Sequence, residues 1–203
     1  MRHGKNTAAT MLADAWTKQR GSSVATLAFA DALKEECAES FGVDPRMFYA
    51  DELKDAPQQA LTLSKCREPG FVQLCLANTF PILLDEPQRP RFVLQFWGTE
   101  FRRALDPEHW CKEVSRRIAD IKHRGFGLAI ITDVRFLNEA NMIKDLGGSI
   151  WKIYRPNATR QGASSMHHSE REMESMRVDA TFTNDSIEQL QMAITDAAQG
   201  VGR

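Results

Sequence analysis

Hydrophobic positions in the first part of the chain change their spacing twice. Over residues 6–19 they recur at helical spacing, which predicts an amphipathic helix that ends at Gly21. The run SVATLAF (23–29) is short and continuously apolar, as in a strand buried inside a parallel sheet. Residues 30–42 return to helical spacing and finish at Gly42. Helix, strand and helix are therefore expected to follow one another.

The middle of the chain is less regular, and the second half alternates again. Prolines interrupt the polar segment 43–70, and the run 71–91 fits neither period. Helical patterns then cover 92–105 (bent around Gly98), 107–125, 137–148 and 186–198, the last capped by Ser186 or Asp185. Apolar runs at 126–136, 149–156 and 180–185 predict three more strands. This alternation favours an α/β fold with a parallel sheet and helices on both faces.

Composition narrows the class of protein. The 203 residues suit one domain with a sizeable core, and 42% hydrophobic with 26% charged residues is ordinary for a globular protein. A formal net charge of −1 argues against a globally basic surface for nucleic acid, while a local basic groove stays possible. The four cysteines lack C-x-x-C spacing, which predicts reduced thiols. No apolar run has the length of a membrane span, and the N-terminus lacks an apolar signal core.

The first candidate chemistry is a phosphate-binding loop. Gly4 and Lys5 precede the first helix, and Thr7 follows Asn6 in its first turn. Glycine lets backbone N–H groups wrap around phosphate, lysine reaches the β- and γ-phosphates, and the helix N-terminus adds partial positive charge. In the full G-x-x-x-x-G-K-[ST] pattern the first glycine would precede Met1, and Asn6 takes the usual Ser/Thr position. Alone, the Gly-Lys pair also fits a helix cap with a solvated lysine.

Asp133 is the second candidate. It ends the apolar run 126–132, and open α/β sheets bind ligands at the carboxyl ends of their strands. A carboxylate there can hold Mg²⁺ directly or through water. A helix cap, or an ion pair with Arg135, is the structural alternative.

Arginines form a third group of candidates, because guanidinium groups neutralise the charge that phosphoryl transfer spreads over the γ-oxygens. The candidates are Arg102, Arg103, Arg155 and Arg160. The segment MHHSE (166–170) suggests a metal site at first sight. Adjacent histidines rarely bind one ion, so a mobile loop is the preferred interpretation.

An ordered set of motifs along nearly the whole chain, with 56–90 as the exception, resembles one family. The motifs are RHGKNTAA, FADALKE, LQFWGTEFRR, HWCKEV, IITDVRFLNEA, GGSIWKIYRP, HHSE and FTNDSIEQL. Together they resemble the phage-type deoxynucleoside monophosphate kinases of the P-loop nucleoside monophosphate kinase superfamily. The resemblance implies ATP- and Mg²⁺-dependent transfer of a γ-phosphoryl group to a deoxynucleoside monophosphate.

The resemblance also implies roles for individual residues. The catalytic residues would be Lys5, Arg102, Asp133 and Arg155. The donor ATP would be held by Arg2, His3, Gly4, Lys5, Asn6, Thr7, Arg160 and Asn184. The acceptor nucleotide would be held by Asp31, Lys34, Gln95, Gly98, Thr99, Arg102 and Arg135. Thr7 and Asp133 would bind the magnesium ion.

The implied architecture is a three-layer P-loop kinase fold in one domain, residues 1–203. It would carry a monophosphate-binding insertion at 31–105 and a lid-like loop at 156–172. The family keeps a strand and a glycine ahead of its phosphate loop, so the first strand of the sheet is expected to be missing here and the natural reading frame to start upstream. The implied setting is the cytoplasm of an infected bacterial host, with small-molecule nucleotides and a possible homodimer as partners and no membrane.

Two other functions stay open. A related P-loop kinase could phosphorylate hydroxymethylated pyrimidines within phage DNA, which would need a basic groove and show strong salt dependence. A non-catalytic nucleotide-binding protein could keep the fold with a truncated phosphate loop, because fold does not imply function.

Overall fold

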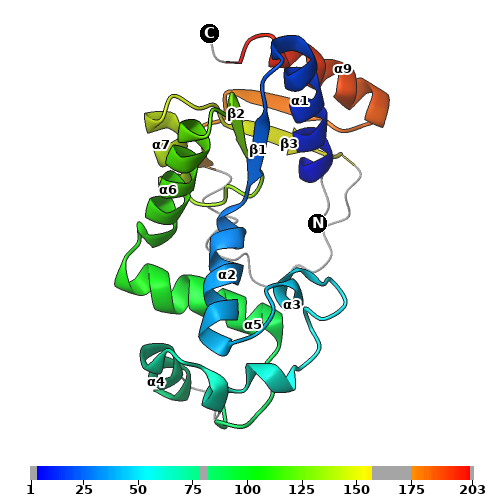
Figure 1. Ribbon diagram of the computed structural model, residues 1–203. Helices are drawn as coiled ribbons and strands as arrows, with labels where there is room; N and C mark the ends of the chain where they lie inside the picture. The colour runs from blue at the N-terminus through cyan, green and yellow to red at the C-terminus, as the bar shows by residue number, and fades with distance from the viewer. Residues whose placement is uncertain (1–3, 78–81, 157–174, 202–203) are drawn as a thin grey trace. The chain divides into compact units, whose positions relative to one another are not determined.

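The computed structural model describes residues 4–77, 82–156 and 175–201, which form helices and short parallel strands (Figure 1). The elements up to residue 77 are α1 (Lys5–Arg20), β1 (Val24–Leu27), α2 (Phe29–Phe41), α3 (Arg46–Tyr49), two short 3₁₀ turns η1 (Gln59–Leu61) and η2 (Leu63–Lys65), and α4 (Pro69–Ala77). The later ones are α5 (Pro90–Gln95), the π-helical η3 (Phe96–Arg103), α6 (His109–His123), β2 (Leu128–Ile131), α7 (Leu137–Asp145), β3 (Trp151–Tyr154), β4 (Ala180–Thr183) and α9 (Ile187–Ala198). The predicted helices and strands are confirmed in type, and their ends shift by a few residues.

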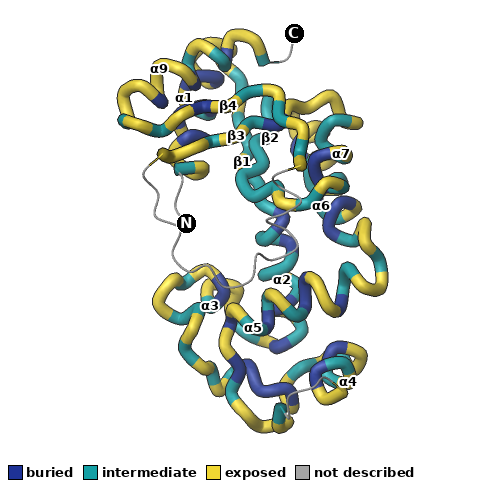
Figure 2. Tube along the Cα trace, turned by 180° about the vertical axis from the view of Figure 1, so that it is seen from behind, coloured by how far each residue is buried: buried dark blue, intermediate teal, exposed yellow. Residues whose placement is uncertain are grey.

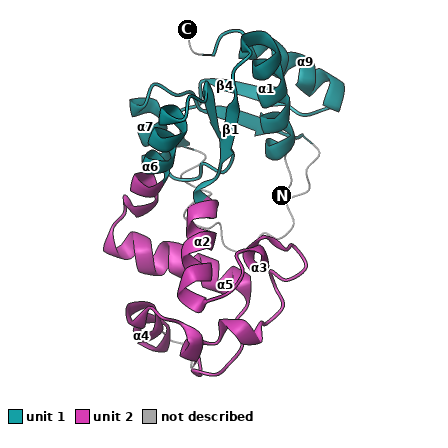
Figure 3. Ribbon diagram, viewed as in Figure 1, with its two compact units in different colours: residues 1–29, 114–203 teal, residues 30–113 magenta. Residues whose placement is uncertain are grey.

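The chain divides into two compact units (Figure 3). Unit 1 consists of residues 1–29 and 114–203, and unit 2 of residues 30–113. The insertion expected at 31–105 lies inside unit 2, while its monophosphate-binding role stays a prediction. The expected lid at 156–172 falls outside the described residues except for Pro156.

The strands of unit 1 form two parallel pairs. Val24 of β1 aligns with Leu128 of β2, and Trp151 of β3 aligns with Ala180 of β4. The mixed α/β class with parallel strands is thus confirmed. The described residues contain two two-stranded sheets, where one continuous sheet was expected. The three-layer arrangement and the strand expected ahead of Gly4 stay predictions.

One apolar core joins both strand pairs of unit 1 to two helices. The buried residues come from α1, α9 and β4, and they are Ala8, Met11, Leu12, Ala15, Phe182, Leu190, Ile194 and Ala198. Alternate residues of β2 and β3 pack against this cluster, namely Leu128, Ile130, Trp151 and Ile153. Figure 2 shows the buried positions of α1 and α9 in dark blue. The start of α1 is therefore held against the same core as the strands.

The core of unit 2 is built around aromatic side chains. Trp97 is fully buried, and its ring centroid lies 4.4 Å from that of Phe71 and 5.3 Å from that of Phe101. Phe71 meets Phe41 edge-on at 6.2 Å. Such offset and edge-to-face contacts add to the free energy gained by burying the rings. This cluster fixes η3, the segment that contains several of the expected acceptor residues.

Two predicted local features are confirmed by backbone geometry. Gly21 ends α1 in the left-handed conformation, with φ 64° and its N–H bonded to Thr17 O. Ser186 caps α9, and its hydroxyl accepts a hydrogen bond from Gln189 N at 3.2 Å. Within the described part of the chain, no helix is both long and apolar enough to cross a membrane.

Candidate functional site

Candidate functional residues follow the carboxyl ends of the strands in unit 1. Phe29 comes two residues after β1, Asp133 two residues after β2, Arg155 directly after β3 and Asn184 directly after β4. Within each parallel pair these ends share one edge. This edge is where open α/β sheets bind ligands.

The N-terminus of α1 has the features of an anion site. Gly4 is the N-cap in the left-handed conformation, with φ 87°, and no side chain caps the helix. The first turn contains no acidic residue. The leading N–H groups of a helix have no partner inside the helix and carry partial positive charge. An anion such as phosphate can satisfy both conditions.

Asn184 brings the end of β4 to this helix start. A Cβ atom added to Gly4 would collide with Asn184 Nδ2. The backbone N–H of Asn184 donates to Tyr154 O at 2.6 Å, which continues the β3–β4 ladder by one residue. The structure therefore places Asn184 against Gly4. Its expected role near the bound ATP stays a prediction.

Lys5 is surrounded by charged groups from the loop after β2. Its residue surface is exposed, yet the surroundings of the ammonium are crowded, and this desolvation lowers its pKa. The positive charge of Arg135 lowers the pKa further, and Asp133 acts in the opposite direction. A negatively charged phosphate beside Lys5 would oppose this lowering of the pKa, because it would favour the charged ammonium. The structure thus places Lys5 within the electrostatic influence of Asp133 and Arg135, while the expected roles of these three residues stay predictions.

Asp133 is held by the backbone that follows β1. Its Oδ1 accepts a hydrogen bond from Phe29 N at 2.7 Å. This contact ties the carboxyl end of β2 to that of β1, so the carboxylate has a defined position at the strand edge. Sequence reasoning missed the part played by Phe29, because a backbone donor leaves no signal in the residue type.

Glu139 fixes the loop between Asp133 and α7. It is 2% exposed, and its Oε2 accepts hydrogen bonds from Arg135 N at 2.7 Å and Phe136 N at 3.1 Å. An acidic side chain in the first turn that reaches back to the preceding N–H groups is half of a capping box. The spacing Phe136-x-x-Glu139 could have revealed it. The missing Ser or Thr at the cap position hid the pattern.

The expected magnesium ligands, Thr7 and Asp133, stay predictions. Mg²⁺ in nucleotide sites is held by one or two carboxylates or hydroxyls, with phosphate oxygens and water as its other ligands. Asp133 offers such a carboxylate, and Thr7 exposes a hydroxyl in the first turn of α1. This donor set fits an ion that arrives with a nucleotide. No group of three or more His, Cys, Asp or Glu side chains able to hold a metal occurs within the described ranges.

The other residues expected to bind the donor ATP are either exposed or lie outside the described residues. Asn6 is exposed in the first turn of α1, and its carbonyl oxygen accepts a hydrogen bond from Thr10 Oγ1 at 3.1 Å. Arg155 is exposed just after β3. Arg2, His3, Arg160 and the MHHSE segment lie outside the described residues.

In unit 2, two residues of α2 that are expected to bind the acceptor nucleotide contact the same tyrosine. The ammonium of Lys34 lies 3.7 Å from the centroid of the Tyr49 ring. The Tyr49 hydroxyl donates to Asp31 Oδ1 at 2.8 Å. Tyr49 was not among the predicted residues, because a single aromatic in a polar segment carries no distinguishing pattern.

The residues of η3, and Gln95 just before it, that are expected to bind the acceptor nucleotide differ in exposure. Gln95 and Thr99 are exposed, whereas Gly98 is buried. A Cβ at Gly98 would lie 3.1 Å from Leu33 Cδ2, and Gly98 O accepts a hydrogen bond from Trp110 Nε1 at 3.1 Å. Gly98 therefore allows close packing of η3, and its expected substrate contact stays a prediction.

Arg102 belongs to a polar network centred on Glu36. Its Nε donates to Glu36 Oε1, and its guanidinium carbon lies 4.6 Å from the centroid of the Phe101 ring. Glu36 also accepts from Trp97 Nε1 at 3.0 Å and contacts His109 Nε2 at 3.1 Å. Sequence reasoning selected Arg102 but missed Glu36, which looks like any charged residue of an amphipathic helix.

Comparison with known proteins gives this geometry a context. Residues 82–194, more than half of the chain, match the family described as deoxynucleotide monophosphate kinase. The chain is also similar to a protein of Acanthamoeba polyphaga mimivirus named "Putative deoxynucleotide monophosphate kinase". The two are 29% identical over 175 residues, which cover 86% of this chain and 78% of the relative. The chain therefore belongs to the deoxynucleotide monophosphate kinase family.

Proposed function

We propose that this protein transfers the γ-phosphoryl group of ATP, with Mg²⁺, to a deoxynucleoside 5′-monophosphate, in phage nucleotide metabolism. The single observation that carries the proposal is the uncapped start of α1 at Gly4, with Lys5 beside Asp133, in a chain of this family. A bound phosphate would accept hydrogen bonds from the helix N-terminus and compensate the cations around it.

The donor nucleotide would bind in unit 1. Gly4, Asn6 and Thr7 would hold its phosphates at the start of α1, and Lys5 would neutralise their charge. Asp133 and Thr7 would hold the Mg²⁺ ion, which would supply positive charge to offset the charge that develops on the phosphates. Asn184 would border this site, and Arg155 would contribute further positive charge.

The acceptor nucleotide would bind in unit 2. Lys34 and Arg102 would provide cations for its phosphate, with Asp31, Gln95 and Thr99 as polar contacts for the rest of the molecule. A phosphate oxygen of the acceptor forms the new bond to the γ-phosphorus, the bond to the β–γ bridging oxygen breaks, and ADP leaves. A monophosphate oxygen is already a competent nucleophile, so positioning and charge neutralisation carry most of the catalysis.

The test is a coupled assay that measures ADP release from Mg-ATP. The full chain is offered dTMP, dGMP, dCMP, dAMP, hydroxymethyl-dUMP and hydroxymethyluracil-containing DNA in parallel. We expect turnover on at least one free monophosphate. Turnover on DNA alone would replace the proposal with a DNA-modifying kinase, and ATP binding without any transfer would identify a non-catalytic protein.

Lys5→Met is the decisive variant, and Lys18→Met is its matched control in the exposed last turn of the same helix. Loss of one preorganised cation at the transferred group should lower kcat by about 100-fold or more. Lys18→Met should leave kcat unchanged. Near-normal turnover of Lys5→Met would contradict the assignment of the phosphate site.

Thermal unfolding separates lost chemistry from lost structure. Burial lowers the pKa of Lys5, so keeping the ammonium charged opposes folding below the folded-state pKa. This penalty fades as pH rises through the folded-state pKa toward the ordinary value. At pH 7 the Tm of Lys5→Met should therefore equal or exceed that of the wild type. Added ATP should raise the Tm of the wild type more than that of the variant.

A further inference from the structure

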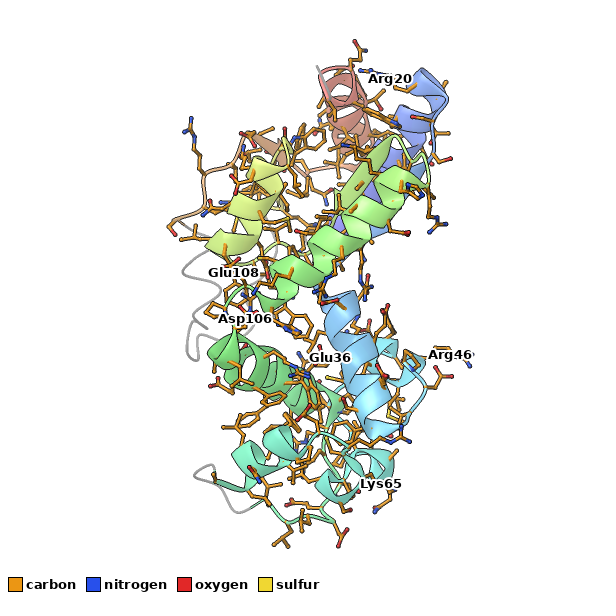
Figure 4. All side chains as sticks on the ribbon, turned by 60° about the vertical axis from the view of Figure 1, so that its left-hand side comes forward. Arg20, Glu36, Arg46, Lys65, Asp106 and Glu108 are labelled. Atoms are coloured by element: carbon orange, nitrogen blue, oxygen red, sulfur yellow. The ribbon has the colours of Figure 1, made fainter. Side chains whose placement is uncertain are left out.

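We infer that Glu36 is a positioning residue that orients the Arg102 guanidinium toward the phosphate of the acceptor nucleotide. The inference rests on the proposed function, because it takes Arg102 as a ligand of that phosphate. Glu36, labelled in Figure 4, belongs to α2, and Arg102 is the penultimate residue of η3. Both residues belong to unit 2, so their contact lies within one compact unit.

Glu36 is held from several sides at once. Its Oε1 accepts from Trp97 Nε1 at 3.0 Å and from Arg102 Nε, and its Oε2 lies 3.1 Å from His109 Nε2. Trp97 is fully buried, so its indole has one position from which to donate. Hydrogen bonds from fixed donors to an ionised carboxylate are strong and directional. The carboxylate is therefore a rigid reference point for the arginine.

Glu36 restrains the direction of the Arg102 side chain but leaves several of its N–H donors available. Its contact with Glu36 uses Nε, and within the described residues its other nitrogens make only a looser ion pair, Nη2 to Glu68 Oε2 at 3.6 Å. The Phe101 ring, and the Trp97 ring at 5.6 Å, flank the guanidinium. The side chain keeps 24% of its surface exposed. A guanidinium has five N–H donors, so several stay available for a phosphate.

The backbone around Arg102 is unusual as well. Residues 96–103 form a π-helix, a conformation that occurs mostly as short insertions and often at functional sites. Trp110 Nε1 bonds Gly98 O at 3.1 Å, and Leu33 fits against Gly98. Two buried tryptophans thus hold this segment through their indole N–H groups, one through Glu36 and one directly. The result is an arginine on a locked piece of backbone.

Such preorganisation has a defined kinetic consequence. A long cationic side chain loses rotamer freedom when it binds an anion, which reduces affinity. If Glu36 has already restricted Arg102, that loss occurs on folding and not on binding. Removing Glu36 should therefore weaken recognition of the acceptor phosphate and act only through Arg102.

The test is a double-mutant cycle with Glu36→Ala, Arg102→Ala and the double variant, read as the KM for the best monophosphate acceptor. Glu36→Ala should raise this KM about tenfold, equivalent to about 1.4 kcal/mol. In the Arg102→Ala background the same change should alter the KM by less than about twofold, because the interaction it serves is gone. The KM for ATP should stay within about twofold in every variant.

Two more variants separate positioning from folding. Glu36→Gln keeps an oxygen that can accept from Arg102 Nε, so its acceptor KM should lie between those of the wild type and Glu36→Ala. Glu39→Ala changes an exposed glutamate of the same helix and should leave both KM values unchanged. Thermal unfolding of each variant identifies those that fail to fold, and Glu36→Gln then carries the test.

Distinct results would overturn the inference. An equal effect of Glu36→Ala with and without Arg102 would show a merely structural role. A lower acceptor KM in Glu36→Gln would show that Glu36 competes with the phosphate for Arg102. If the wild type turns over no monophosphate, the proposed function fails, and the same cycle is read by calorimetric binding of the monophosphate against its nucleoside. Binding that ignores Glu36 would then overturn the inference as well.

Discussion

Gly4 meets two requirements at the scale of a single residue. Its φ of 87° is in the left-handed region, which side chains other than glycine adopt at a cost of about 1–2 kcal/mol. A Cβ at this position would also collide with Nδ2 at the end of the Asn184 side chain, which would have to move away. Gly21 at the other end of α1 has φ 64°, but no atom lies within 4 Å of the position that a Cβ would take there. Comparing substitutions at the two glycines therefore separates the cost of backbone strain, which both share, from the cost of steric contact, which only Gly4 has.

Gly4→Ala should lower the free energy of unfolding more than Gly21→Ala does. Gly21→Ala should cost about 1 kcal/mol, from backbone strain alone. Gly4→Ala should cost that amount and a smaller further contribution, because the end of the Asn184 side chain must move away from the added Cβ. Urea unfolding of both variants measures the difference. Adding Asn184→Ala to Gly4→Ala should recover the extra contribution, and equal losses for the two glycine variants would contradict the steric explanation.

At the scale of elements, Asp179 joins the beginnings of β3 and β4. Its carboxylate accepts hydrogen bonds from Lys144 Nζ and from Ile150 N, the latter at 2.6 Å. Its own backbone N–H donates to Ile150 O at 2.8 Å. The ammonium of Lys144 and the Ile150 N–H lower the pKa of Asp179 below the ordinary 3.8. This residue thus anchors α7 and both strands through one side chain.

The contribution of Asp179 to stability should depend on pH. Because its pKa is lower in the folded state, the contribution is complete above the unfolded-state value of 3.8 and disappears as pH falls through the folded-state pKa. The pair is partly exposed, so Asp179→Asn should cost at most about 1 kcal/mol at pH 7. Urea titrations from pH 7 to pH 2 should show this difference shrinking. Asp14→Asn, an exposed change on α1, should show no such trend.

At the scale of the whole molecule, all four cysteines lie in unit 2. Cys37, Cys75 and Cys111 are buried and Cys66 is partly exposed, and all four are free thiols, as the sequence predicted. Burial raises the pKa of Cys75 to about 12 and that of Cys37 well above its ordinary value. Thiolate is the reactive form, so Cys37 and Cys75 are protected both by their burial and by their protonation.

Thiol labelling should therefore report the opening of unit 2 alone. At pH 8 a disulfide reagent should modify Cys66 first, and the buried thiols only as fast as unit 2 opens. In urea all four should react rapidly. If the acceptor binds unit 2, a saturating monophosphate should slow labelling of the buried thiols in a Cys66→Ser variant. Rapid native labelling of Cys75 would contradict the buried environment.

How far each scale could be predicted follows from the range of the forces involved. The periods of apolar residues predicted each strand and most helices, because burial of one face is a local constraint on sequence. Glycine and serine at helix ends were equally visible, as Gly21 and Ser186 illustrate. The pairing of strands into two separate sheets was not predictable, because it depends on partners distant in the chain. The same holds for the π-helical backbone of η3, which was expected only as a bend at Gly98.

The sequence by itself determined the α/β class, the type and approximate extent of most elements and the unpaired cysteines, and it suggested the candidate residues Lys5, Asp133 and Arg102, whose roles stay predictions. Each of these follows from residue type and local spacing. Only the tertiary structure decided which atoms hold Asp133 and Arg102, since Phe29 N and Glu36 lie far from them in the sequence and act through contacts that no spacing encodes. Local propensity acts over a few residues, whereas the positions of charged side chains are set by burial and hydrogen bonding between distant segments.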